Sequence, residues 1–329
     1  MTVIVTGSAG HLGEALIRTL RRDGKACRGI DLKPSPYTDA VGSIRDREFV
    51  RRNLKDGRAV IHAATLHKPH IGTHDNLEFV GTNIDGTLIL LEEAVAAGIG
   101  AFVYTSTTSA FGSALNPGDC EPAAWITEDV PAVPKNIYGA TKTAAESLCE
   151  MFARRKRLAA IILRTARFFP EPDDDPEIRN GYETLNAQAN ELLYRRVDLE
   201  DAVSAHLLGV GRAETLGFGR YIISATTPFT PDDLALLREH APEVVRRRYP
   251  EYADLFSVRH WRMFPGVDRV YVNRLAIQDL GWSPKYDFAH VLGCLRSGED
   301  FRSPLAQQVG QKGYHDVVFD DGPYPLARK

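Results

Sequence analysis

Tyr138 and Lys142 are the residues whose types and spacing most directly indicate chemistry, in the segment Tyr138-Gly139-Ala140-Thr141-Lys142. On an α-helix, side chains four positions apart lie on the same face. A phenol with its ordinary pKa near ~10 is a poor base at neutral pH, but a neighbouring ammonium group favours the phenolate. Tyr138 could then accept a proton from a hydroxyl group while a hydride leaves the same carbon. The pair therefore predicts oxidation of an alcohol, with Tyr138 as general base.

A glycine-rich segment near the N-terminus predicts a site for the hydride acceptor. Gly7, Gly10 and Gly13 follow the apolar run Thr2–Val5 and lead into an amphipathic stretch. The first glycine permits a tight turn, the second lets the backbone approach a pyrophosphate, and the third lets helix and strand pack closely. The N–H groups that open the helix, including those of His11 and Leu12, would face the phosphates. This order of elements is typical of a dinucleotide site.

Asp31 predicts which dinucleotide is bound. It ends the second apolar run, eighteen residues after Gly13. A carboxylate there would bond the ribose hydroxyls and repel a 2′-phosphate, which favours NAD over NADP. Arg28 and Lys33 are close in sequence and weaken this preference, and Asp31 could instead be a turn residue before Pro34.

The elements that would position these residues alternate between short apolar runs and amphipathic stretches, which indicates βαβ units and a parallel sheet. Strands are expected at Val3–Val5, Ala26–Asp31, Ala59–His62, Ala101–Ser106, Ala159–Arg164 and Arg220–Ile223, and helices at Leu12–Arg22, Phe49–Leu54, Asn76–Ala97, Asn136–Arg154 and Glu200–Gly209. The predicted fold is an α/β, Rossmann-type doubly wound parallel sheet with a smaller, mixed C-terminal substrate domain.

The regular alternation of apolar runs and amphipathic stretches ends after residue 168, which suggests a division into two domains. Residues 1–168, with 198–225 returning to them, would bind NAD, and residues 169–197 and 226–329 would bind the substrate. Phe169–Arg179 holds three prolines and five acids and is expected to be a loop. The basic run Arg246–Arg248 is expected on an exposed helix face, with phosphate binding as an alternative. The last 25 or so residues are expected to form an extended arm.

Composition limits the class of protein. The chain has 329 residues, 43% hydrophobic and 25% charged, with a formal net charge of -3, so no nucleic-acid or membrane partner is indicated. No apolar run approaches the roughly 18 residues that span a bilayer. The four cysteines, Cys27, Cys120, Cys149 and Cys294, are scattered and are expected to be reduced thiols of a cytoplasmic protein.

Seven segments in order resemble the extended short-chain dehydrogenases/reductases, which include NAD-dependent sugar epimerases and dehydratases. They are TGSAGHLG, Asp31, HAAT (62–65), NIDGT (83–87), YTSTTSAFG (104–112), YGATK and LGWSPKYDF (280–288). The resemblance implies that Thr107 holds the substrate oxygen, with Ser106 and Thr108 as alternatives, and that Lys142 also bonds the nicotinamide ribose. It implies that Asn83 is mainly structural. The further cofactor contacts that it implies are Ser43, Ile44, Ala63, Ala64, Thr65, Thr105 and Phe168.

The segment after the strand Ala159–Arg164 departs from the nucleotide-sugar epimerases. Arg167 stands where their Asn is expected, so the usual diphosphate contact is in doubt. Phe169-Pro170-Glu171-Pro172 and Lys68-Pro69 are instead similar to uronate dehydrogenases of the same superfamily, which use a substrate-contacting hydroxyl where Thr65 lies. Arg167 and Arg179 are candidates to bind an anionic substrate group. Both could instead pair with the acids of residues 171–177.

Four histidines, at positions 62, 67, 70 and 74, lie close together in the sequence. Imidazoles bind zinc, but the family requires no metal and none is expected. His67 is the candidate to contact the substrate, with His70 as an alternative to it, and a structural role in the loop is the other interpretation.

These observations predict an NAD-dependent enzyme that oxidises a secondary alcohol of a sugar, sugar acid or sugar nucleotide. A net dehydrogenase is slightly favoured. The alternative is an NAD-dependent nucleotide-sugar epimerase or dehydratase with a transient keto intermediate, and a non-catalytic dinucleotide sensor is a remote one. A homodimer is expected, paired through the helices Asn76–Ala97 and Asn136–Arg154.

Overall fold

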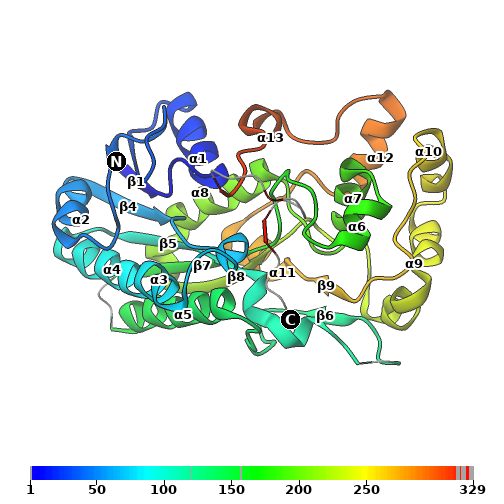
Figure 1. The fold of residues 1–329 in the computed structure, drawn as a ribbon, viewed down its shortest axis with the longest axis horizontal. Helices are drawn as coiled ribbons and strands as arrows, with labels where there is room; N and C mark the ends of the chain where they lie inside the picture. Colours follow the sequence, from blue (N-terminus) through cyan, green and yellow to red (C-terminus); the bar gives the residue numbers. More distant parts are fainter. Residues whose placement is uncertain (1, 119, 156–157, 316–318, 320–323, 326–329) are drawn as a thin grey trace.

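A seven-stranded parallel sheet forms the centre of the larger part of the molecule (Figure 1). The structure is a computed structural model that describes residues 2–118, 120–155, 158–315, 319, 324 and 325. The strands follow the order β3-β2-β1-β4-β5-β7-β8. Their bounds are β1 Thr2–Thr6, β2 Cys27–Asp31, β3 Ala40–Val41, β4 Gly57–His62, β5 Ala101–Thr107, β7 Ala159–Thr165 and β8 Phe218–Ile223. The predicted Rossmann-type α/β class is therefore confirmed. Because the chain order reverses between β1 and β4, ligands are expected at the carboxyl ends of these strands.

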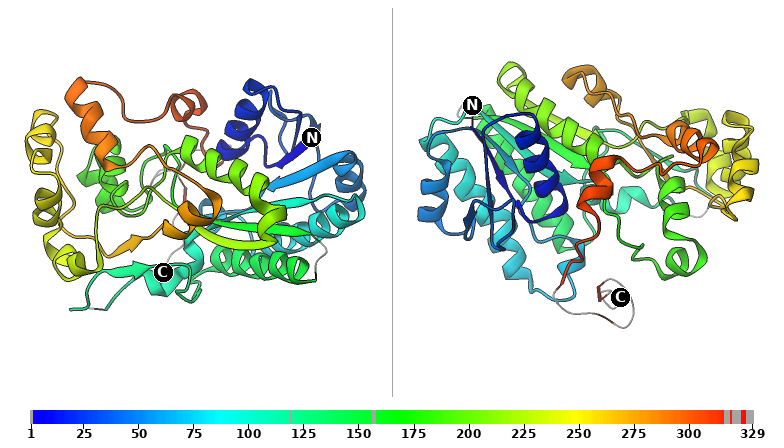
Figure 2. Two further views of the ribbon diagram at one scale, coloured as in Figure 1. Left: turned by 180° about the vertical axis from the view of Figure 1, so that it is seen from behind. Right: turned by 90° about the horizontal axis from the view of Figure 1, so that it is seen from above.

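Helices cover both faces of the sheet (Figure 2). They are α1 (His11–Arg22), α2 (Arg47–Leu54), α3 (Asn76–Val80), α4 (Gly86–Ala96), α5 (Ile137–Arg154) and α8 (Leu199–Leu216). In β1, Val3 and Val5 pack in the core cluster with α1 and α8, whereas Ile4 packs in the cluster with α2, α4 and α5. This alternation, with every one of these side chains buried, explains why the strands read as continuous apolar runs.

The remaining elements build a mixed region around a two-stranded parallel sheet of β6 (Ala124–Ile126) and β9 (Arg269–Tyr271). Its helices are α6 (Pro176–Gly181), α7 (Thr184–Glu191), α9 (Leu234–Arg248), α10 (Tyr252–Val258) and α12 (Phe288–Ser297). Helices α11 (Arg274–Leu280) and α13 (Pro304–Val309) instead pack against α8 beside the main sheet. Aromatic residues such as Phe256, Phe264 and Phe288 form a core cluster here that is separate from the two around the main sheet. The exact boundaries of a substrate domain stay a prediction.

Three segments differ from the sequence-based expectation. The stretch Phe169–Arg179 is not all loop, because Asp175 caps α6 by accepting a hydrogen bond from the N–H of Glu177, and Pro176 suits the first helical position. The helix expected over Asn76–Ala97 contains a π-helical turn at Gly81–Asp85. Of the expected C-terminal arm, residues 304–309 form α13. Its residues 316–318, 320–323 and 326–329 lie outside the described residues.

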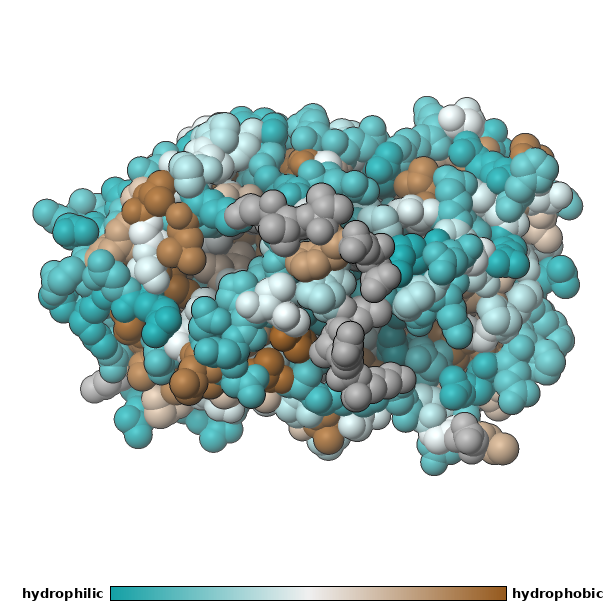
Figure 3. All heavy atoms as spheres, in the orientation of Figure 1, coloured by the Kyte–Doolittle hydropathy of each residue, from teal (hydrophilic) through white to brown (hydrophobic). Residues whose placement is uncertain are grey.

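The surface in view is mostly hydrophilic, with small groups of apolar residues between the polar ones (Figure 3). Arg246–Arg248 end α9 and are exposed, as the sequence suggested. Among the described residues, no helix is long and apolar enough to cross a membrane.

Candidate active site

Tyr138 and Lys142 lie on the first two turns of α5, beside the carboxyl end of β5. Asn136 caps this helix by accepting a hydrogen bond from the N–H of Gly139 at 3.0 Å, which fixes where the helix starts and so where Tyr138 lies. The Lys142 Nζ donates to the carbonyl oxygen of Thr105 at 2.5 Å and lies 4.1 Å from the centre of the Tyr104 ring. The helix thus presents both side chains to the end of one strand.

Tyr138 is partly buried, and desolvation raises the pKa of its phenol from 10.0 to about 12, although the Thr107 side chain opposes the rise. Thr107 ends β5, and its Oγ1 accepts the N–H of Ser109 at 3.1 Å. Burial lowers the pKa of Lys142 from 10.5 to about 7, against the raising effect of Glu146. A positive charge close to Tyr138 would help to form the phenolate.

A buried ion pair lies next to this group. Glu146 is one turn after Lys142 on α5, and its carboxylate pairs with Arg164 of β7 at 2.8 Å and accepts a hydrogen bond from Ser106 at 2.5 Å. Because its hydroxyl is engaged with Glu146, Ser106 is a weaker candidate than Thr107 for holding a substrate oxygen. Thr108, the other alternative, is buried directly after Thr107. Sequence reasoning missed Glu146, although its i+4 spacing from Lys142 was visible.

The glycine-rich turn has the close packing that a dinucleotide site requires. Gly7 has a φ of +75°, and a Cβ placed on it would lie 2.7 Å from the backbone N of Ala64. A Cβ on Gly13 would lie 1.9 Å from the Gly7 carbonyl oxygen. Gly10 starts α1 without a side-chain cap, so the first N–H groups of the helix, from His11 and Leu12 onward, are available to a phosphate.

Other predicted cofactor contacts surround this turn. Asp31 ends β2 and accepts the N–H of Ala9 at 3.0 Å and that of Lys33 at 2.8 Å. These bonds orient the carboxylate beside the glycine turn, while the side chain of Arg28 bonds the carbonyl oxygens of Asn53 and Lys55 instead. These residues fit NAD. The glycine turn leaves space that any side chain would fill, the first N–H groups of α1 have no side-chain cap, and Asp31 supplies a carboxylate.

The loop after β4 connects the cofactor side to α5. The N–H of Ala63 bonds the carbonyl oxygen of Thr6 at 3.3 Å, and that of Ala64 bonds the Thr6 Oγ1 at 3.1 Å. The Thr65 hydroxyl donates to Asn83 Oδ1 at 2.9 Å, and Asn83 donates to Thr141 at 3.0 Å. Asn83 therefore ties this loop to the helix that carries Tyr138 and Lys142.

Four predicted cofactor contacts have side chains that interact with other parts of the protein in this structure. Ser43 accepts the N–H of Arg45 at 3.1 Å, and Ile44 is buried in the core cluster under α2 and α4. Thr105 pairs its hydroxyl with His206 at 2.9 Å. The Phe168 ring packs against that of Phe169 in a tilted arrangement, with ring centres 4.4 Å apart. A cofactor contact by Ser43, Ile44, Thr105 or Phe168 stays a prediction.

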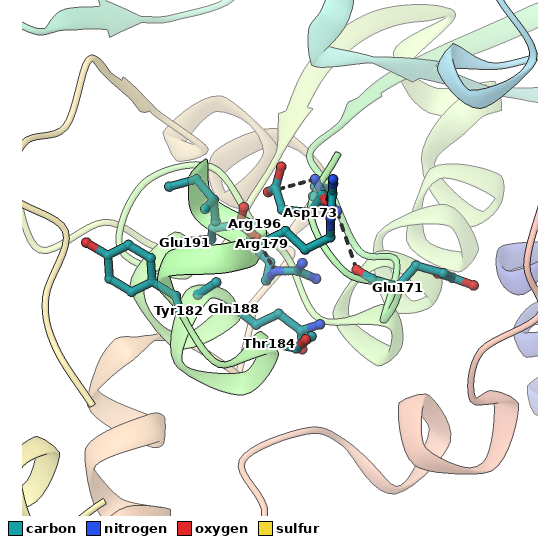
Figure 4. A pocket seen from close by; sticks show the side chains of 11 residues that line it. Glu171, Asp173, Arg179, Tyr182, Thr184, Gln188, Glu191 and Arg196 are labelled. Atoms are coloured by element: carbon teal, nitrogen blue, oxygen red, sulfur yellow. Dashed lines mark hydrogen bonds and ion pairs between the residues drawn. The ribbon is translucent and has the colours of Figure 1, made fainter. Parts of the chain in front are cut away.

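A small pocket lies between the loop after β7 and helices α6 and α7 (Figure 4). Its lining mixes acids, bases and amides rather than cations alone: Arg167, Glu171, Asp173, Ile178, Arg179, Tyr182, Thr184, Ala187, Gln188, Glu191 and Arg196. Both arginines proposed to bind an anionic substrate are therefore in this pocket.

Both arginines already interact with other residues of the chain. Arg167 lies 3.0 Å from Asp173 and 3.3 Å from Asp174, and Arg179 donates to the carbonyl oxygen of Asp173 at 2.8 Å. Although burial alone would raise the pKa of Glu191, the charges of neighbouring arginines hold it well below its usual value, so this buried acid is ionised. The pairing that the sequence left open for Arg167 is thus present.

The loop histidines form a chain of ring contacts. His67 packs on His70 with ring centres 4.6 Å apart and is nearly parallel to Phe169 at 5.5 Å. Burial lowers the pKa of His67 well below its usual value, so this ring is neutral near pH 7. Within the described residues, no group of three or more His, Cys, Asp or Glu side chains is arranged to hold a metal ion.

Comparisons with known proteins identify the family of this chain. The model of the NAD dependent epimerase/dehydratase family matches residues 3–203. A UDP-glucose 4-epimerase of Azospirillum brasilense is 26% identical, with 94% of each chain covered. An uncharacterized protein of Sinorhizobium fredii, y4nG, is 34% identical, but the match covers 50% of this chain and only 40% of that protein.

Solved structures have the same fold at low sequence identity. A short-chain dehydrogenase/reductase superfamily protein of Agrobacterium tumefaciens with bound NAD has a TM-score of 0.65 at 21% identity, covering 94% of this chain and 99% of that one. MoeE5 in complex with UDP-glucose and NAD has a TM-score of 0.61 at 22% identity, covering 91% and 99%. With the family model over more than half of its length, this chain belongs to the NAD dependent epimerase/dehydratase family.

Proposed function

We propose that the protein oxidises a secondary alcohol of a sugar-type substrate, with Thr107 holding the alcohol oxygen and Tyr138 accepting its proton. The observation that carries this proposal is that Thr107, at the end of β5, is close enough to the Tyr138 phenol for its side chain to lower the pKa of that phenol. A substrate oxygen bound by both hydroxyls would have a proton acceptor within reach. Bound NAD supplies the hydride acceptor.

Lys142 has two roles in this proposal. Its ammonium group favours the Tyr138 phenolate, and Glu146 supports that charge because it counters the effect of burial on the lysine. The bond from Lys142 Nζ to the Thr105 carbonyl oxygen holds the side chain against the strand end. The oxidation thus depends on three side chains from two elements, β5 and α5.

For the reaction class, we propose epimerase- or dehydratase-type chemistry, in which the hydride returns to a keto intermediate. Support comes from the likeness to a UDP-glucose 4-epimerase along 94% of the chain. The pocket supports a neutral, hydroxyl-rich sugar moiety, because its amide, hydroxyl and charged groups of both signs offer donors and acceptors.

A net dehydrogenase acting on a sugar acid is the second candidate. The observation in its favour is Arg167 in the pocket wall, since a guanidinium group matches a carboxylate. The ion pairs of Arg167 with Asp173 and Asp174 weaken this reading, because they already engage the charge.

One experiment separates the two reactions. The purified protein is mixed with NAD and uronic acids, aldoses and UDP-, GDP- and dTDP-sugars in turn, while absorbance at the NADH band and product isomers by chromatography are followed. Product isomers or dehydrated products without net NADH are expected. A steady rise in NADH with one sugar acid would replace the proposal with the dehydrogenase. No turnover with any sugar would contradict both.

A further inference from the structure

The segment Gly310–His315, called here the C-terminal arm, lies against the carboxyl edge of the main sheet rather than extending away from it. It follows α13, which packs against α1 (Figure 2). The backbone N–H groups of Lys312 and Gly313 donate to Glu171 Oε1 at 3.0 and 3.2 Å, and the Tyr314 hydroxyl donates to Glu171 Oε2 at 3.3 Å. Three donors of the arm therefore meet at one carboxylate.

Glu171 also binds the first turn of α1. Its Oε1 lies 2.8 Å from His11 Nε2, and its side chain is only 5% exposed. Burial alone would raise the pKa of Glu171, but the hydrogen bond and charge of His11 outweigh it and keep the pKa below its usual value. The carboxylate is thus ionised and connects the arm to the residue that begins the helix next to the glycine turn.

The arm touches the other loops that border the same edge. The Lys312 ammonium group pairs with Glu14 of α1 at 2.5 Å. The Tyr314 ring lies 5.2 Å from His67 and 5.8 Å from Phe169, and His315 bonds the carbonyl oxygen of Pro69 at 2.9 Å. The contacts therefore come from segments that follow β1, β4 and β7, around the place where open α/β sheets bind their ligands.

We propose that the C-terminal arm is a closing wall of the dinucleotide site, that Glu171 is its latch, and that this wall keeps the cofactor bound from one turnover to the next. This inference rests on the proposed function in so far as NAD occupies the glycine cradle. It deepens that function, because an enzyme that returns its hydride to the substrate has no need to release the cofactor, whereas a net dehydrogenase must exchange it in every cycle. Glu171 is a positioning residue here, since it acts through the arm.

The latch is tested with Glu171→Gln, which keeps the shape of the side chain. An amide has one acceptor oxygen where the carboxylate has two, so some of the four donors lose their partner. Glu177→Gln is the matched control, because Glu177 is an exposed acid six residues further along the same segment. A chain that ends at Val309 removes the arm outright and leaves α13 in place.

The first readout is the dissociation rate of NADH, measured by fluorescence after chasing with excess NAD. Glu171→Gln is expected to release NADH at least tenfold faster than the unchanged protein and the Glu177→Gln control, and the shortened chain faster still. Equal rates in all four folded proteins would overturn the proposal. Tighter NADH binding by the shortened chain would also overturn it, because the arm would then compete with the cofactor.

The second readout does not involve cofactor release. Trypsin cuts after lysine, so cleavage at Lys312–Gly313 reports how firmly the arm is held. NAD is expected to slow this cleavage in the unchanged protein, and Glu171→Gln is expected to abolish that protection; cleavage that NAD does not affect in the unchanged protein would contradict the closing wall. The release measurement is repeated in Tyr138→Phe to separate the closing wall from the proposed chemistry. NADH release does not require catalysis, so slow release in this variant supports the wall whether or not Tyr138 is the base.

Discussion

Lys142 donates a hydrogen bond of 2.5 Å to the backbone carbonyl oxygen of Thr105, across the contact between α5 and β5. This bond joins the helix that carries Tyr138 to the strand that ends in Thr107. It holds the Lys142 side chain, which is buried, against the strand end beside the helical turn that carries Tyr138.

Replacing Tyr138 with Phe is expected to lower turnover by about 10²–10⁴-fold, because proton transfer to a positioned base contributes on that order. The ring remains and only the hydroxyl is lost, so the fold and NADH binding are expected to be unchanged. The comparison is made by steady-state turnover with the sugar that reacts in the panel assay and by NADH fluorescence titration. Full activity in this variant would refute Tyr138 as the base.

Lys142 predicts a specific pH dependence of stability in the absence of cofactor. Burial lowers its pKa from 10.5 to about 7, so between these values the unfolded chain binds more protons at this residue than the folded protein does. The lysine's contribution to the free energy of unfolding therefore rises with pH across this window. In Lys142→Met that contribution is absent. Urea unfolding at several pH values between about 7 and 8.5 should therefore show a free energy of unfolding that rises less steeply with pH than in the unchanged protein. Subtracting the two pH dependences removes the contribution of the titratable groups that both proteins share. An equal pH dependence in the two proteins would show that Lys142 is not desolvated.

Gly13→Ala is expected to damage the dinucleotide site, because the new Cβ would lie 1.9 Å from the Gly7 carbonyl oxygen and force α1 away from the turn. We expect NADH affinity to fall more than tenfold, with a lower melting temperature. Gly211→Ala is the control, since nothing lies within 4 Å of that position in α8 and alanine is the better helix former. Unchanged NADH affinity in Gly13→Ala would contradict the cradle.

Asp31→Asn is expected to narrow the preference for NAD over NADP. The neutral amide no longer repels a 2′-phosphate and is a weaker partner for ribose hydroxyls. Dissociation constants for NADH and NADPH, taken at one ionic strength, should move toward each other. Asp39→Asn, another acid near β2, is the comparison; it removes a carboxylate that accepts the N–H of Gly29 at 2.7 Å, so its effect should be on stability more than on cofactor choice.

Glu146→Gln is expected to destabilise the protein by roughly 3–5 kcal/mol, because it leaves Arg164 buried without its charged partner. The two side chains are 1% and 4% exposed, so solvent cannot replace the lost interaction. Glu150→Gln, one turn further along α5 with a side chain that is 23% exposed, should cost much less. Chemical denaturation measures both, and equal losses would argue that the buried pair has no special weight.

Patterns in the sequence are enough to predict the fold class, the family and the local geometry of the main motifs. Continuous apolar runs separated by amphipathic stretches identify a parallel sheet covered on both faces, and Gly7, Gly10 and Gly13 identify its first turn, because only glycine fits where a Cβ would meet backbone. The spacing of Tyr138 and Lys142 fixes their common face because it depends only on the repeat of one helix.

The tertiary structure alone decided the pairings between distant segments. Arg167 was a candidate for an anionic substrate, yet it pairs with Asp173 and Asp174, a choice that depends on how the loop after β7 folds back. The last 25 or so residues are expected from the sequence to form an extended arm, yet the Tyr314 hydroxyl bonds Glu171, 143 positions away in the chain. Such contacts have no local periodicity, since burial and charge pairing across the fold determine them, and for that reason no pattern in the sequence could predict them.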